Sequence, residues 1–527
     1  MRRVGGGSGG FGGAMSLAFN KVYMSQNFKK YYQIAYLWIF LACIAVLPMS
    51  GTIALRNIFL VLMLCLFLYG NIFVLDIRKN TFETLKKVPT SLSLWIAYLC
   101  VFPLWAPMPE IAWENLRGQW GESIVAWTVG LGAFVLLGQR SPGIWKLAMA
   151  SAFPLYVHLF LALLAYIGVF SDNFYQSIEN RSLDGLYAEI NNWIHGGLAG
   201  LNPHHPLDEG FKGVEVMHGN LGYTSSVAVA LLTAKLFGSN RETGIRAALL
   251  CVVAIGLCFL SLLIARSRGA MIFNALILCA GIIWSGSAGI ARKRAITSIP
   301  GKHIRFNFRA VVVSFMVFML FGIGALGLKT DPRWTGMADR IAAGFLIKNP
   351  LETLCAGLSV DEEALIRGRL SNYAPNYVDE VISHLRDGDG GRVVLMREGA
   401  QLVRENPLGL DGSRQSYERL MQKKCQARPV LDYSHSHNSW LDMSLAIGYL
   451  GVALFAAIFI HFCVIAWSNF SIKTDGSVAM ALGLISIFWF FRGFFDSLYR
   501  EHYLEMQAIL LIYLYLVLRK SISETVE

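Results

Sequence analysis

The most prominent feature of the sequence is a series of long apolar segments separated by polar stretches. Several of these segments approach or exceed the roughly 20 apolar residues that a helix needs to cross a bilayer core. The runs are continuous, whereas the strands of a transmembrane β-barrel alternate apolar and polar residues. The pattern therefore predicts an all-α, polytopic membrane protein with about twelve transmembrane helices, at roughly 33–49, 52–75, 90–105, 122–138, 146–170, 219–237, 246–265, 269–288, 310–328, 441–468, 477–497 and 504–519.

Composition points the same way. Of the 527 residues, 55% are hydrophobic and 15% are charged, and the mean hydropathy is +0.48. These values do not suit a water-soluble globule of this length. The formal net charge of +11 would suggest nucleic acid in a soluble protein, but here Lys and Arg are expected to collect in cytoplasmic loops. We therefore expect membrane lipids, and no nucleic acid, as partners.

The basic loops predict the orientation of the chain. With twelve spans, the clusters of Lys and Arg between and beside the spans all fall on one side, which must be the cytoplasm. They are Lys29, Lys30, Arg78, Lys79, Lys86, Lys87, Arg292, Lys293, Arg294, Lys302, Arg305, Arg309, Arg519 and Lys520. We expect a disordered cytoplasmic N-terminus at 1–32, spans 1–9 at 33–328, a periplasmic loop at 329–440, spans 10–12 at 441–519 and a cytoplasmic tail at 520–527.

The long loop at 329–440 has structure of its own. A helix is predicted from about Arg392 to Glu405, where Asn406-Pro407 stops it. Its apolar positions are spaced to form one packed stripe, so we expect a small helical cap rather than a separate domain. Cys355 and Cys425 both lie in this loop. On the extracytoplasmic side they could form a disulfide, and two free thiols remain the alternative.

Polar side chains close to the membrane are the candidates for chemistry, because hydrocarbon cannot solvate them. On the predicted topology all of them fall at or near the extracytoplasmic face, whereas a random scatter would divide them between the two faces. The candidates are Arg117, His218, Arg266, Arg268, Arg392, His437, Asn438 and Arg492.

Arg266 and Arg268 are predicted to lie at a tight reversal between two spans, in "LLIARSRGAMIF". Arginine can simply extend toward water from a helix end. However, such basic residues should prefer the cytoplasmic side. A hairpin tip lined with guanidinium groups is suited to bind phosphate, because each group donates two parallel hydrogen bonds.

For the other arginines, both a structural role and a ligand-binding role are possible. Arg392 opens the loop helix, and the simpler interpretation is that it lies on a solvated face of that helix. Arg117 has a Trp nearby on each side, which indicates either an aromatic belt at headgroup depth or a ligand role. Arg492 is four residues before Asp496 and could form a structural ion pair with it.

His437 stands immediately before a predicted span whose start carries Asn438. Near a helix N-terminus the macrodipole disfavours the imidazolium form. A neutral imidazole can accept a proton near pH 7, as a general base must; a capping or hydrogen-bonded histidine is the alternative. His435 is expected to be structural or exposed, and His218 opens another span.

Metal and nucleotide sites are not predicted. The "DGDG" at 387–390 is typical of a turn, and the histidines lack ligand-like spacing to carboxylates. No P-loop motif occurs. We expect no metal and no cofactor.

Taken together, the segments resemble the superfamily of O-antigen ligases, O-antigen polymerases and O-linked oligosaccharyltransferases. The matching pieces are "ARSRGA" at 265–270, "GR" at 391–392, "ENPLGLDG" at 405–412 and "HNSWLDMSLAIGYLGV" at 437–452. The resemblance covers roughly residues 220–455 and includes the order of these pieces and the long loop before the histidine.

The resemblance implies a GT-C-like glycosyltransferase of lipopolysaccharide biosynthesis in the bacterial inner membrane, with its active site facing the periplasm. The implied reaction is inverting and metal-independent. Its donor is a glycan on undecaprenyl pyrophosphate, and for the ligase branch its acceptor is a sugar hydroxyl of lipid A–core. In the resemblance, His437 corresponds to the family's catalytic histidine, and Arg268 and Arg392 correspond to its donor-binding arginines. Arg266 and Arg117 match donor-binding arginines less closely. From their positions at the starts of two spans, we also expect Asn438 and His218 to support the site.

Three other functions remain open. An O-antigen polymerase would use the same donor with a second carrier-linked glycan as acceptor, and we favour the ligase over it. A protein O-oligosaccharyltransferase ranks third among these functions. Those enzymes often carry a larger C-terminal extracytoplasmic portion, whereas we expect only a short cytoplasmic tail at 520–527 after the last span. A transporter or flippase would require charges near the bilayer midplane, and this sequence has few.

Overall fold

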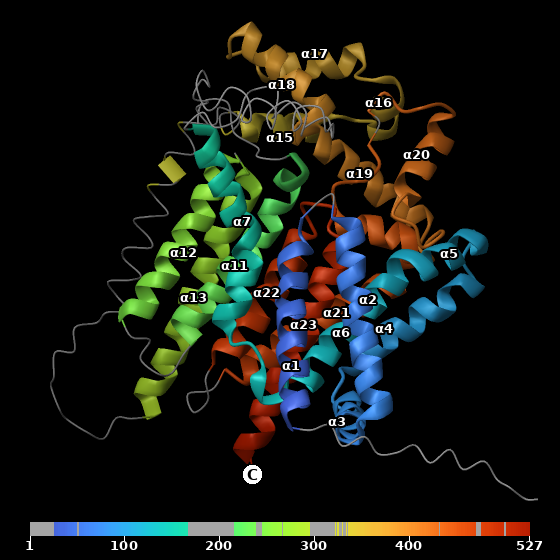
Figure 1. Cartoon of the computed structure of the whole chain (residues 1–527). Coiled ribbons are helices and arrows are strands. Elements are labelled where there is room, and N and C mark those ends of the chain that lie inside the picture. The colour runs from blue at the N-terminus through green and yellow to red at the C-terminus, as the bar shows by residue number, and fades with distance from the viewer. Residues whose placement is uncertain are drawn as a thin grey trace, which may run out of the picture.

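The structure is a computed structural model that describes residues 26–49, 52–166, 215–238, 245–265, 267–295, 336–431, 433–470, 476–499 and 502–526, with a few isolated positions between 322 and 334. Its described part is helical throughout, with no strand (Figure 1). The bundle consists of α1 (Gln26–Val46), α2 (Ile53–Phe73), α3 (Leu75–Leu85), α4 (Thr90–Val101), α5 (Pro109–Asn115), α6 (Gly121–Leu137), α7 (Ile144–Tyr166), α11 (Glu215–Gly238), α12 (Ile245–Ile264), α13 (Arg268–Ala295), α21 (Ser439–Ser468), α22 (Ser477–Arg492) and α23 (His502–Val526), with short turns η1 (Phe102–Leu104), η2 (Leu116–Trp120) and η3 (Gly138–Arg140).

Eight helices of the described part are long and apolar enough to cross a membrane, and up to nine if the bent pair of α3 with α4 and η1 is one span. The all-α, polytopic membrane fold is thus confirmed. The predicted segment 90–105 belongs to that bent pair, and 477–497 corresponds to the shorter α22. The segment 33–49 corresponds to α1, which is not among the eight, and 310–328 lies almost wholly outside the described residues.

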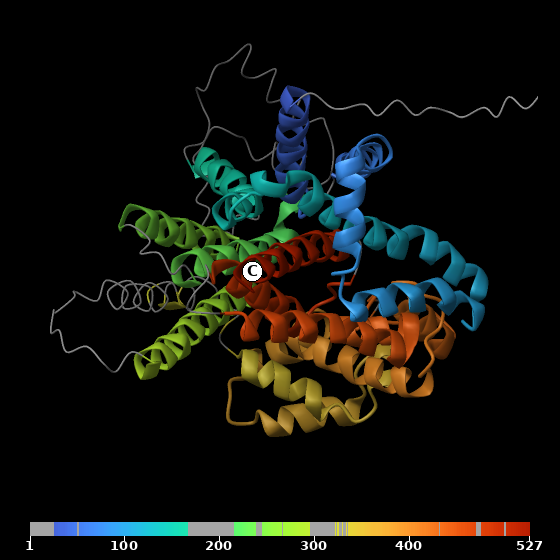
Figure 2. The same cartoon turned by 90° about the horizontal axis from the view of Figure 1, so that it is seen from below.

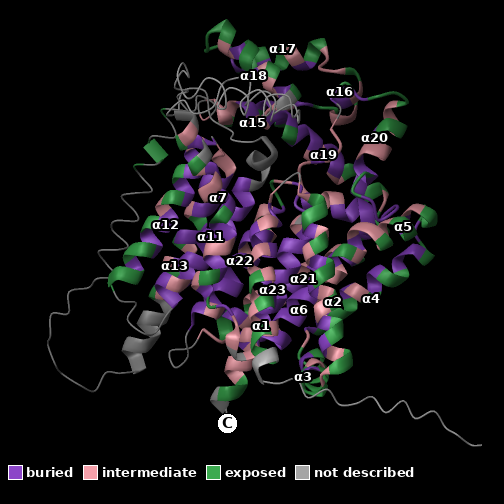
Figure 3. Ribbon diagram, in the orientation of Figure 1, coloured by how far each residue is buried: buried purple, intermediate pink, exposed green. Residues whose placement is uncertain are grey.

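Helix α11 is the centre of the bundle. In its apolar part, Leu221–Gly238, 94% of residues are buried, whereas only five of the 21 residues of α2 are buried (Figure 3). The exposed side chains of α2 are large and apolar, as expected of a helix that faces lipid. Small residues allow close approach: a Cβ on Gly130 of α6 would lie 2.6 Å from the Ile509 carbonyl oxygen of α23. The bundle is therefore packed at its centre and apolar at its periphery.

The two ends of the bundle differ. The extramembrane helices lie at one end, which we call the cap end, and the C-terminus lies at the other (Figure 1). Helix α3, which carries Arg78 and Lys79, is at the C-terminal end. Seen from below, the cap helices project past α21, on the side away from α1 and α7 (Figure 2).

The cap consists of α15 (Met337–Leu346), α16 (Pro350–Ala356), α17 (Val360–Arg369), α18 (Pro375–Asp387), α19 (Asp389–Glu405) and α20 (Ser416–Cys425). The predicted helix 392–405 is α19, which begins three residues earlier and ends at Glu405 as expected. The cap has its own hydrophobic core, which also takes in Leu445 of α21. It is therefore a folded unit that is seated on the bundle.

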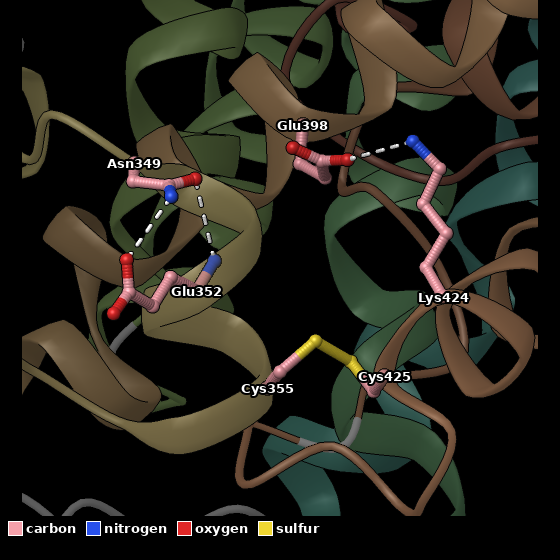
Figure 4. Close-up of a disulfide and its surroundings, with 6 residues drawn as sticks. All are labelled: Asn349, Glu352, Cys355, Glu398, Lys424 and Cys425. Atoms are coloured by element: carbon pink, nitrogen blue, oxygen red, sulfur yellow. Dashed lines mark hydrogen bonds and ion pairs between the residues drawn. A yellow bond between two sulfur atoms is a disulfide. The ribbon is translucent and has the colours of Figure 1, made fainter.

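A disulfide joins Cys355 of α16 to Cys425 of α20, which decides between the two alternatives that the sequence left open (Figure 4). Lys424, next to this bond, lies 3.8 Å from Glu398 and 2.7 Å from Glu405, both on α19. The disulfide and the ion pairs thus tie the outer helices of the cap to α19.

A buried carboxylate organises the other side of the cap. Glu362, in the first turn of α17, forms a capping box with Ser359 and accepts backbone hydrogen bonds from Lys348 at 3.0 Å and Asn349 at 3.3 Å. Burial raises the pKa of the Glu362 carboxyl, but the hydrogen bonds from Asn349, Ser359 and Lys348 lower it by more, so the pKa lies below its usual value. The ionised form therefore stabilises this part of the cap.

Candidate active site

Arg268 lies at the cap end of the bundle, as the first residue of α13. Helix α12 ends at Ile264, so only three residues connect the two helices and the predicted tight reversal is confirmed. One guanidinium nitrogen of Arg268 is 3.5 Å from a carboxylate oxygen of Asp389, and both side chains are about one-fifth exposed, at 19% and 18%. Arg266 lies outside the described residues.

Asp389 is shared between the bundle and the cap. Its carboxylate also lies 3.6 Å from Arg340 of α15, a side chain that is only 1% exposed and that has Glu380 at 3.8 Å. Asp389 belongs to the "DGDG" that we interpreted as a turn. It instead begins α19 and neutralises two arginines that are distant in sequence, a role that no local pattern signals.

Arg492, at the end of α22, lies directly against the tip that carries Arg268. A Cβ on Gly269 would be 2.8 Å from a terminal nitrogen of Arg492, so the guanidinium packs closely against the backbone of this glycine. The group also lies over the rings of Phe273 and Tyr223, with its carbon 4.9 and 5.5 Å from their centroids. Such placement favours a fixed guanidinium orientation.

Asp496 is the counter-ion of Arg492. Their side chains are 2.8 Å apart, which confirms the ion pair predicted from the i, i+4 spacing. The Tyr223 hydroxyl donates to the same carboxylate oxygen at 2.7 Å. Asp496 lies between α22 and α23; burial raises the pKa of its carboxyl, but Arg492, Tyr223 and Arg392 lower it by more, so the pKa lies below its usual value.

The influence of Arg392 on Asp496 brings the cap into this group. Arg392 lies on α19, one turn after Asp389, and its side chain is exposed. The spacing of three residues puts Asp389 and Arg392 on the same face of α19. Arg268 of α13 and Arg492 of α22 therefore lie at the cap end beside two carboxylates, and the exposed Arg392 of α19 helps to lower the pKa of one of them, Asp496.

His437 lies two residues before α21 begins at Ser439. Asn438 is the N-cap: its side-chain oxygen accepts hydrogen bonds from the backbone of Trp440 at 3.0 Å and Leu441 at 3.1 Å. His437 has a positive φ of 57° and is half-buried. Its ring centroid is 4.3 Å from that of His435.

The histidine segment is attached to both the bundle and the cap. Ser439 donates its backbone N–H to the carbonyl oxygens of Gly493 at 2.8 Å and Asp496 at 3.0 Å. On the cap side, a Cβ on Gly399 of α19 would lie 2.9 Å from Ser436. A series of contacts thus runs from Gly269, the neighbour of Arg268, through Arg492 and Asp496 to Ser439, two residues after His437.

The glycine motif "ENPLGLDG" has a structural role. Helix α21 is broken at Gly448, where φ is 74°, and Gly409 lies against this break. The Ala446 carbonyl accepts hydrogen bonds from Leu410 at 3.2 Å and Gly412 at 2.9 Å. The motif therefore satisfies backbone groups that the broken helix leaves open.

Two predicted site residues are not joined to this group. Arg117 lies on η2 and is exposed. Within the described residues, no hydrogen bond, ion pair or ring contact connects it to Arg268, Arg392 or His437. The backbone of His218 belongs to α11, and its side chain lies outside the described part.

Converging guanidinium groups beside a helix start with a histidine suit one kind of chemistry. The arginines can bind a phosphate or pyrophosphate and stabilise negative charge that develops on it. A half-buried imidazole can accept a proton from a hydroxyl group. The arrangement is thus suited to displacement of a phosphate leaving group by an alcohol.

Comparison with known proteins gives one family match. Residues 227–456 match the sequence model of a family described as O-Antigen ligase. The matched region runs from α11 through the cap into α21 and includes Arg268, Asp389, Arg392 and His437. A search among curated proteins found no match.

Proposed function

The chain belongs to the O-antigen ligase superfamily, and from this premise we propose that it is an O-antigen ligase. It transfers a glycan from undecaprenyl pyrophosphate to a sugar hydroxyl of lipid A–core, in the inner membrane with the site facing the periplasm. The observation that carries the proposal is the series of contacts from Gly269, next to Arg268, through Arg492 and Asp496 to Ser439 in the His437 segment.

In the proposed reaction, an acceptor hydroxyl oxygen attacks the anomeric carbon of the donor glycan. His437 takes the hydroxyl proton while the bond between the anomeric carbon and the pyrophosphate oxygen breaks. The electron pair of that bond leaves with the pyrophosphate on its lipid carrier, and the anomeric configuration inverts. A positioned base of this kind contributes about 10²–10⁴-fold to the rate.

The arginines act on the leaving group. Arg268 and Arg392 bind the pyrophosphate, and Arg492 adds to the positive field while Asp496 fixes its orientation. Guanidinium groups that are already oriented stabilise the developing charge without reorganisation. Since pyrophosphate is itself a good leaving group, we propose that these groups suffice without a metal ion. We also propose that Arg266 binds the pyrophosphate. Arg117 is proposed to contribute to this binding only from a greater distance.

The test is reconstitution of the purified chain with a polyprenyl-pyrophosphate glycan and either lipid A–core or a second carrier-linked glycan. Glycosylated lipid A–core is the expected product, and EDTA should not reduce its formation. Chain lengthening on the carrier instead would show a polymerase.

Two histidine variants test the base. His437→Ala should lower transfer about 10²–10⁴-fold, while the matched control His435→Ala, two residues earlier in the same segment, should stay within about tenfold of the wild type. If His437→Ala remained folded and fully active, His437 would not be the base.

A further inference from the structure

Helix α3 has two different faces. Ile77 and Thr84 are buried toward the bundle, and Ile77 packs against the position of Gly70 in α2. The other side is exposed although it is apolar: the exposed fractions are 65% for Leu75, 62% for Phe82 and 53% for Leu85. A helix that contacted only water would not present three large apolar side chains together.

Two basic residues lie among these apolar ones. Arg78 and Lys79 are three and four residues from Leu75 and from Phe82, so all four side chains share one region of the helix surface. They line one groove, whose members are Asn71, Leu75, Arg78, Lys79, Thr81, Phe82 and Leu85. The groove therefore combines an apolar floor with two cationic groups.

The position of α3 explains this combination. It follows α2 directly at the C-terminal end of the bundle (Figure 1). Its 11 residues extend about 16 Å, which is too short to cross a bilayer core. Two charges in the groove also exclude it from the hydrocarbon. Helix α3 therefore lies where α2 leaves the membrane, so in the bent pair with α4 and η1 it is not itself the part that crosses the bilayer core.

The charge of this region is positive. Residues 75–87 contain four basic side chains and two acidic ones. Of the acidic side chains, Glu83 pairs with Lys86 at 3.0 Å, and Asp76 lines a different groove together with Lys29 and Arg140. An anionic ligand therefore matches the groove of Arg78 and Lys79.

We propose that this groove binds an anionic phospholipid of the leaflet at the C-terminal end of the bundle. The phosphodiester lies on Arg78 and Lys79, and the acyl chains cover Leu75, Phe82 and Leu85. Amphipathic helices at the membrane surface bind through this combination of apolar burial and attraction to anionic lipid. The site is at the opposite end from His437 and does not depend on the proposed reaction.

The experiment is native mass spectrometry of the full chain in detergent, with either dioleoylphosphatidylglycerol or dioleoylphosphatidylcholine added. The two lipids share their acyl chains and differ in headgroup charge. The wild type should bind the anionic lipid more tightly. The double substitution R78Q/K79Q should weaken that binding about 25-fold, roughly fivefold for each basic residue, and leave the zwitterionic lipid unchanged.

Control variants separate the contributions. Lys423→Gln, which removes an exposed charge from the cap, should change the affinity for neither lipid. Phe82→Ser should weaken the binding of both lipids, because it removes an apolar contact with the acyl chains. Equal binding of the two lipids to the wild type would overturn the proposal even if R78Q/K79Q failed to fold. Displacement of the anionic lipid by glycerol 3-phosphate would show a site for free phosphate instead.

Discussion

If Arg268 binds the donor phosphate as proposed, the carboxylate of Asp389 occupies the position on Arg268 that the phosphate would use. Arg340 lies near the same carboxylate oxygen and can keep Asp389 paired when Arg268 turns to the substrate. Asp389 should therefore compete with phosphate for Arg268. The substitution Asp389→Asn removes the competing charge and preserves the size of the side chain.

The size of the effect follows from the geometry. Two unit charges at 3.5 Å attract by about 4.7 kcal/mol at an effective dielectric constant of 20 and by about 1.2 kcal/mol in bulk water. Both side chains are about one-fifth exposed, and desolvation offsets part of the attraction. A net competition of about 1–2 kcal/mol corresponds to roughly 5- to 30-fold in affinity.

Inorganic pyrophosphate is the probe. It should inhibit transfer by the wild type, and the concentration for half inhibition should fall roughly 5- to 30-fold in Asp389→Asn. Arg340 loses a counter-charge in this variant, so the stability of the variant protein should also fall. Thermal unfolding measures this loss separately.

The matched control is Glu380→Gln, which removes the other carboxylate near Arg340 and does not touch Arg268. Its inhibition by pyrophosphate should equal that of the wild type. If Asp389→Asn required the same or more pyrophosphate than the wild type, Asp389 would not compete with phosphate. If pyrophosphate failed to inhibit the wild type, the proposed donor site itself would be wrong.

Three further predictions concern the cap and the broken helix. The double variant C355S/C425S removes a disulfide between residues 70 positions apart and should lower the stability of the cap by about 2–4 kcal/mol. Reductant should lower the melting temperature of the wild type to that of the variant and leave the melting temperature of the variant unchanged. Glu362→Gln should destabilise the cap by about 1–2 kcal/mol at pH 7. Because the pKa of Glu362 is lowered in the folded state, the wild type should lose this advantage as the pH falls below the ordinary glutamate value of 4.5 and through the lowered pKa. A difference from the variant that persisted in unfolding curves in acid would contradict the assignment. Gly448→Ala should cost at least about 3 kcal/mol, because its φ is 74° and its Cβ would lie 2.5 Å from the Leu408 backbone, whereas Gly368→Ala, with open space around it, should be near neutral in the same melting assay.

Interactions between near neighbours in sequence were accessible from the sequence. The spacing of Arg492 and Asp496 predicted their ion pair, and the apolar stripe with Asn406-Pro407 predicted where α19 ends. Both depend on geometry within one or two helical turns, which every α-helix shares. The cap-end position of Arg268 also followed from the alternation of spans.

Other features could not be read from any local pattern. The sequence left the pairing of Cys355 and Cys425 open, and it gave no sign that Asp389 meets Arg340 and Arg268. It also placed Arg117 among the donor-binding candidates, although the structure links Arg117 to none of Arg268, Arg392 and His437. Nothing near these positions distinguishes a paired side chain from a solvated one.

Hydrophobicity and helical periodicity alone determined that this protein is a bundle of apolar helices with one polar helical cap, because each span must bury its own backbone hydrogen bonds in lipid. Tertiary structure alone decided which charges meet. Arg268 and Asp389 are 121 residues apart, and only the seating of the cap on α21 and on the tip of α13 brings them within reach. The physical reason is that helix formation depends on neighbours in sequence, whereas a site at a helix end depends on how separate helices pack.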